Sequence, residues 1–147
     1  MESFDTFYTI KILHYFVSCA FLIVAIWLLI RTVLGVFMKK EYRKLDQYLS
    51  FAFIANLYLQ LIFGLILFTN LGLTSSSEFL NAGRAVAKRY WPIEHIVIML
   101  FALFIAHLGF ILSYKSQTSY GKHKKILIYY TISVILIIFS LGAIYLL

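Results

Sequence analysis

Long apolar stretches alternate with short polar segments along the whole chain. The apolar stretches cover about residues 12–38, 49–69, 91–114 and 126–147. A helix needs about 20 apolar residues to cross the hydrocarbon core of a bilayer, and each stretch is long enough. The pattern therefore predicts an all-α fold, a four-transmembrane-helix up-down bundle that forms one integral membrane domain over residues 1–147.

The composition favours the same class of protein. Of the 147 residues, 63% are hydrophobic, and the mean hydropathy is +0.91. These values exclude a soluble domain of this size and indicate a lipid bilayer as the surroundings. Cys19, the only cysteine, cannot form an internal disulfide. The net charge of +7 gives no reason to expect a nucleic-acid partner, because the basic residues serve membrane topology.

The basic residues also predict an orientation. Lysine and arginine are enriched in loops on the cytoplasmic side. The first and third loops together hold Lys39, Lys40, Arg43, Lys44, Lys115, Lys122, Lys124 and Lys125. The opposite side holds only Lys11, Arg84, Lys88 and Arg89. We therefore expect the two basic loops in the cytoplasm and both termini on the outer side.

Two histidines fall at matching depths in the first and third spans. His14 lies near the outer start of the first span, and His95 lies near the outer start of the third, soon after a Trp-Pro helix opening. Alternate helices of an up-down bundle face each other diagonally. His14 and His95 can therefore reach a metal at the bundle axis from opposite sides, and imidazole is a common axial ligand of heme iron.

Two glycines lie near the same level on the other two spans. Gly64 is close to the outer end of the second span, and Gly142 is close to the outer end of the fourth. Without side chains they would let a flat porphyrin approach the helix backbone. Glycine also lets membrane helices pack closely, and the sequence leaves this alternative open.

Three polar residues near this level each have two interpretations. Gln60 points the same way as Gly64, and it either bonds a neighbouring helix or lines a cofactor pocket. Arg89 could pair with heme propionates or anchor an interfacial helix at lipid headgroups. Glu94 suits the first turn of a helix and could also orient a ligand.

Three further residues are expected to lie apart from this site. His107 is about 18 Å deeper than His95 and on another helix face, so we expect it to bond a neighbouring helix or to line a quinone pocket. His123, within GKHKK, is expected to be a solvated loop residue. Arg31, inside the first span, is expected to snorkel to the cytoplasmic headgroups.

Three segments carry a resemblance to a known family. They are QLIFGLILF (60–68), RYWPIEHIVIML (89–100) and KHKKILIYY (122–130), and they resemble small bacterial four-helix membrane proteins described as cytochrome b-like. The likeness covers most of the chain and includes His14, although LHYFVSCA replaces the Arg-Trp pair usual after that histidine. The resemblance implies heme b and a bacterial inner (cytoplasmic) membrane, so the outer termini would be periplasmic.

The sequence leaves two main functions open. One is a heme b protein in which His14 and His95 ligate one iron near the outer face and electrons pass between quinol and a redox partner. The other is a cofactor-free accessory subunit that packs against a larger membrane complex. A proton or ion pathway through Glu94, His95 and His107 lacks a continuous polar stripe. No catalytic set is apparent, so an enzyme with its own chemistry is not expected.

Overall fold

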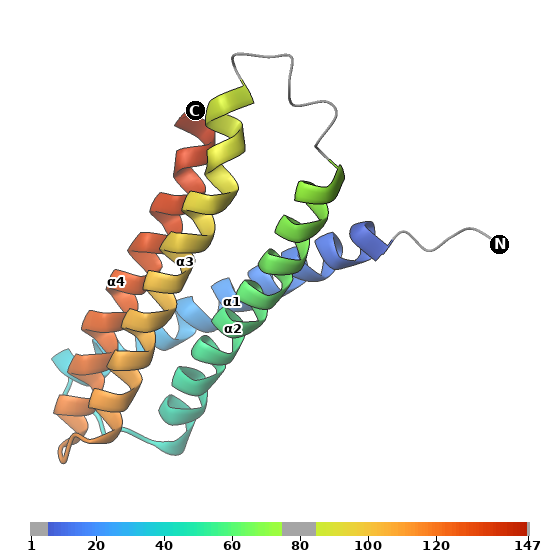
Figure 1. Cartoon of the computed structure of the whole chain (residues 1–147). Helices are drawn as coiled ribbons and strands as arrows, with labels where there is room; N and C mark the ends of the chain where they lie inside the picture. The colour runs from blue at the N-terminus through green and yellow to red at the C-terminus, as the bar shows by residue number, and fades with distance from the viewer. Residues whose placement is uncertain (1–5, 75–84, 147) are drawn as a thin grey trace.

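Four α-helices make up nearly all of the described chain, residues 6–74 and 85–146 of a computed structural model (Figure 1). Their bounds are α1 Thr6–Phe37, α2 Lys44–Thr74, α3 Ala85–Tyr114 and α4 Ser119–Leu146. The described residues contain no strand. All four helices are long and apolar enough to cross a membrane. The predicted all-α, four-helix membrane bundle is therefore confirmed.

All four helices begin earlier than their apolar stretches, at residues 6, 44, 85 and 119 rather than at 12, 49, 91 and 126, and polar groups cap two of them. Helix α2 starts at Lys44 rather than at 49, and the Arg43 backbone N–H donates a hydrogen bond to Asp46 Oδ2 at 2.9 Å. Helix α4 starts at Ser119 rather than at 126, where the Gly121 N–H donates to Thr118 Oγ1 at 3.1 Å. Charged segments that were expected in loops thus belong to helices.

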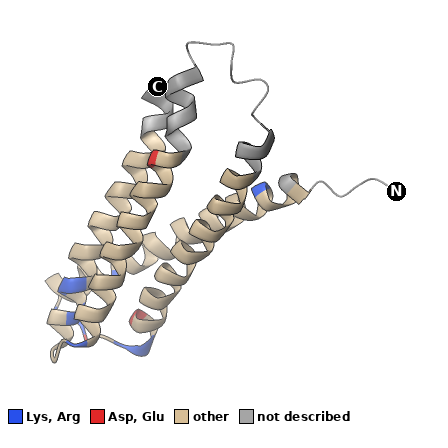
Figure 2. Ribbon diagram, in the orientation of Figure 1, with Lys and Arg blue, Asp and Glu red and all other residues tan. Residues whose placement is uncertain are grey.

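The helices run alternately up and down, and each packs against two others. Helix α1 contacts α2 and α4, and α3 contacts the same two helices, so α1 and α3 face each other diagonally. Helices α3 and α4 lie side by side, whereas α1 and α2 diverge from them towards the end that carries the C-terminus (Figure 1). We call this the termini end. The opposite end, with residues 38–43 and 115–118, is the basic end, because Lys and Arg gather there (Figure 2).

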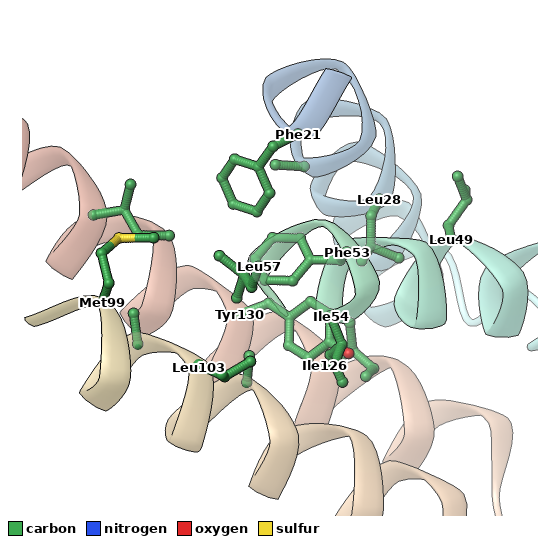
Figure 3. Close-up of a cluster of buried hydrophobic side chains, with 14 residues drawn as sticks. Phe21, Leu28, Leu49, Phe53, Ile54, Leu57, Met99, Leu103, Ile126 and Tyr130 are labelled. Atoms are coloured by element: carbon green, nitrogen blue, oxygen red, sulfur yellow. The ribbon is translucent and has the colours of Figure 1, made fainter. Parts of the chain in front are cut away.

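An aromatic stack fills the middle of the bundle. The Phe53 and Tyr130 rings stack with centroids 4.3 Å apart, and the Phe21 ring lies 4.8 Å from that of Phe53 (Figure 3). The Tyr130 hydroxyl donates a hydrogen bond to the Ser50 carbonyl at 2.9 Å. The phenol is thus satisfied although it is fully buried, and the stack joins α1, α2 and α4.

The outside of the bundle is also apolar. Large side chains such as Phe37, Phe16 and Phe139 are 79%, 71% and 65% exposed. Similar side chains cover the outer faces of all four helices, far beyond the patches that soluble monomers expose. The hydrocarbon tails of lipids can cover such an apolar surface without cost. The chain is accordingly a multi-pass membrane protein.

Candidate functional site

His14 lies half-buried on α1, beside α2. A Cβ atom added to Gly64 would lie 3.8 Å from His14 Cε1, so the structure brings together two residues that the sequence analysis placed at one level. His14 Nδ1 is buried and has no hydrogen-bond partner among the described residues. A buried polar atom without a partner is uncommon, because leaving it unpaired costs about 1–3 kcal/mol.

Hydrogen bonds hold α1 and α2 together next to this histidine. Gln60, which is buried on α2, donates through Nε2 to Ser18 Oγ at 2.8 Å and to the His14 carbonyl at 3.3 Å. The Ser18 hydroxyl in turn donates to the same carbonyl at 2.8 Å. Gln60 therefore bonds the neighbouring helix, which is one of its two predicted roles, and it contacts the backbone of His14 rather than the ring.

His95, on α3, is within hydrogen-bond distance of a residue of α4. Its Nδ1 lies 2.7 Å from the Oγ atom of Ser140, a buried residue that the sequence analysis did not single out. A hollow of about 380 Å³ lies beside the pair. Its walls are Ile93, Glu94, His95, Val97 and Ile98 of α3 and Phe139 and Ser140 of α4. The hollow is mainly apolar, and His95, Ser140 and Glu94 supply its polar groups.

The two histidines belong to the same region of the bundle. His14 and His95 come from the diagonal helices α1 and α3, and they lie within electrostatic range of each other. Gly142 has no described atom within 4 Å of the position that a Cβ would take, so it lies in open space rather than against a ring. The side chain of Arg89 lies outside the described residues. The structure thus groups His14, Gln60 and Gly64 on one side and His95 on the other.

His107 is separate from this group. It is exposed on α3, and its ring meets the Tyr58 ring edge-on, with centroids 6.4 Å apart. The described residues contain no cluster of three or more potential metal ligands.

The expectation for His123 was wrong. Its side chain is only 1% exposed, because α4 begins at Ser119 and His123 faces the bundle in line with Ile126 and Tyr130. The ring packs on Gly35 of α1, where an added Cβ would lie 2.4 Å from ring atoms. The Glu41 backbone is close, yet neither ring nitrogen makes a hydrogen bond of normal geometry to a described residue.

Tyr42 covers His123 from the loop between α1 and α2. The two rings meet edge-on with centroids 5.0 Å apart, and the Tyr42 hydroxyl is 3.2 Å from Ser50 Oγ. Burial raises the pKa of the Tyr42 phenol, so this ring stays neutral beside the imidazole. His123 is consequently enclosed by α1, the loop and its own helix.

Arg31 forms an ion pair that was not expected, while the expectation that it snorkels to the headgroups stays a prediction. Arg31 Nε lies 2.5 Å from Asp46 Oδ1, and its Nη2 lies 3.2 Å from Oδ2. The Asp46 side chain is fully buried, whereas that of Arg31 is 30% exposed. The pair joins α1 to the first turn of α2, and the sequence analysis missed it because it considered each charge by itself.

Comparison with known proteins finds no relative. No model of a protein family matches the chain, and neither does any curated protein or solved structure. The resemblance to cytochrome b-like proteins therefore stays a prediction that rests on the quoted segments.

Proposed function

We propose that the chain is a membrane heme b protein in which His14 and His95 are the two axial ligands of one iron. The observation that carries the proposal is that two histidines lie on diagonal helices within electrostatic range, and that one of them has a buried nitrogen with no described partner. Axial ligands from facing helices are a common way to build a cofactor site in a four-helix bundle. Heme, when bound, supplies a one-electron couple whose potential is set by the axial ligands and by burial.

The surrounding residues support the two ligands. The bonds from Gln60 to Ser18 and to the His14 carbonyl fix α1 against α2 at the level of His14. Gly64 lies beside the His14 ring: a methyl group there would only reach van der Waals contact with Cε1, and a side chain longer than that of alanine would extend into the space next to the ring. The open space at Gly142 leaves room on α4, and we assign Arg89 to a heme propionate.

Electrons would pass between quinol and a redox partner, either a separate protein or a larger membrane complex. The hollow beside His95 suits a quinone ring that enters from the bilayer, because its walls are mainly apolar and it has few polar groups. The apolar outer faces of the helices can also pack against another membrane subunit. In the alternative without a cofactor, such packing would be the whole function.

We place the protein in a bacterial inner membrane with both termini in the periplasm. The basic end would face the cytoplasm, following the enrichment of lysine and arginine there. We expect a phosphatase fused to the C-terminus to be active and a green fluorescent protein fused there to be dark. Fusions within residues 115–118 should give the reverse. A fluorescent C-terminal fusion would overturn the orientation.

The ligand assignment predicts a characteristic spectrum. Purified, reduced protein should show the sharp absorption bands of six-coordinate low-spin heme. His14→Ala and His95→Ala should each abolish or broaden these bands, because each leaves the iron with one protein ligand. His107→Ala is the matched control, since it removes an exposed histidine from the same helix as His95, and it should leave the bands unchanged.

Two results would contradict the proposal. A protein that stays colourless when heme is supplied would favour the accessory subunit. Bands that survive both His14→Ala and His95→Ala but disappear in His107→Ala would move the heme deeper into the membrane.

A further inference from the structure

Ser140 is positioned to control how His95 presents its ring. The serine is 1% exposed on α4, and its Oγ is 2.7 Å from His95 Nδ1. Serines inside helices often donate their hydroxyl proton to the carbonyl four residues earlier. Ser18 and Ser50 both do so in this chain, at 2.8 and 2.7 Å. A serine whose hydroxyl donates in this way still has its oxygen lone pairs to accept from an imidazole N–H, and the 2.7 Å contact of Ser140 with His95 Nδ1 allows that direction.

We propose that Ser140 is a positioning residue that holds His95 in the tautomer protonated at Nδ1. In this tautomer Nε2 carries the lone pair and is the nitrogen that can bind a metal. The purpose of this contact rests on the proposed function, because a histidine that binds a metal commonly donates its other ring N–H to a hydrogen-bond acceptor. The tautomer of His95 in the protein without heme can be measured directly, whether or not the proposed function holds.

The same contact makes the two proposed ligands unequal. In the proposed tautomer His95 Nδ1 donates to Ser140, 2.7 Å away, whereas His14 Nδ1 has no described partner. A hydrogen bond from the far nitrogen makes an imidazole a stronger electron donor to the metal, which favours the oxidised iron. Loss of the Ser140 hydroxyl should therefore raise the reduction potential while both axial ligands stay in place.

The first test uses the full chain in detergent before heme is added. Nitrogen-15 NMR of the histidine side chains distinguishes the two tautomers. In the wild type we expect His95 to be protonated almost entirely at Nδ1, and in Ser140→Ala we expect a mixture of tautomers. Ser140→Thr keeps a hydroxyl and should restore the wild-type signal. Ser133→Ala is the matched control, because Ser133 is equally buried on α4 but donates to the Ala102 carbonyl instead.

The second test uses the heme-loaded protein. Ser140→Ala should keep the low-spin bands and show a higher midpoint potential, and Ser133→Ala should match the wild type. If Ser140→Ala leaves both the tautomer and the potential unchanged, the inference is wrong even where heme binds. If the tautomer responds but no variant, including the wild type, binds heme, the proposed function fails and the positioning of His95 by Ser140 stands.

Discussion

Replacing Arg31 with alanine is expected to lower the free energy of unfolding by about 3 kcal/mol or more. The change removes the counterion of the Asp46 carboxylate, which is fully buried in the native structure, and leaves the Arg43 backbone N–H as its remaining described hydrogen-bond donor. An unpaired buried charge is far more costly than the missing side chain itself. Reversible unfolding in mixed detergent micelles, followed by circular dichroism, would measure the loss.

The basic end supplies a matched control. Arg43→Ala removes the same charge from an exposed side chain but keeps the backbone N–H that caps α2, so the expected change is within about 0.5 kcal/mol. Arg31→Lys should fall between the two, because an ammonium group cannot bind both carboxylate oxygens as a guanidinium does. If Arg31→Ala were no more destabilising than Arg43→Ala, the ion pair would not stabilise the fold.

Gly35→Ala should also destabilise the bundle, by about 1–3 kcal/mol. The new Cβ would lie 2.4 Å from the His123 ring, and this ring is confined by Tyr42 on another side. Either α1 or α4 must therefore move to relieve the overlap. The measurement is the same unfolding experiment, and Gly142→Ala is its control, because no described atom lies within 4 Å of the new methyl group there.

A double mutant separates this steric effect from a general cost of changing glycine. His123→Ala alone should be destabilising, since it removes a buried ring and leaves a cavity. The pair Gly35→Ala with His123→Ala should be no less stable than His123→Ala, because the added methyl group then has space. Additive losses from the two changes would show that the ring and the glycine do not contact each other.

Much of the fold could be predicted because it follows from bilayer thickness and chain connectivity. Each span needs a fixed apolar length, and short loops place alternate helices on the diagonals of the bundle. The same reasoning brings Gly64 to the level of His14, since α1 and α2 run in opposite directions from a short loop. These are properties of long segments, and single substitutions alter them little.

The contacts of individual polar residues were harder to predict. His123 was missed because lysines surround it in the sequence, so hydropathy placed the start of the fourth span too late, at 126 rather than at 119. The signal was present in the spacing: positions 123, 126, 130, 133, 137 and 140 follow a repeat of three and four residues, and all six are buried. The same repeat would have identified Ser140. Asp46 was missed because its partner lies across the loop, on another helix.

The ion pair between α1 and α2 also constrains how the chain is inserted during synthesis. An arginine inside a membrane helix opposes insertion, by about 3 kcal/mol at the helix centre and by less towards the helix end, where Arg31 lies. When α1 leaves the ribosome its arginine has no counterion, because Asp46 is still inside the exit tunnel. The first helix should therefore wait in the translocon or at the membrane surface and enter the lipid together with α2. We expect the first two helices to integrate as a hairpin, so a nascent chain that ends before Asp46 should integrate less efficiently than one that includes α2.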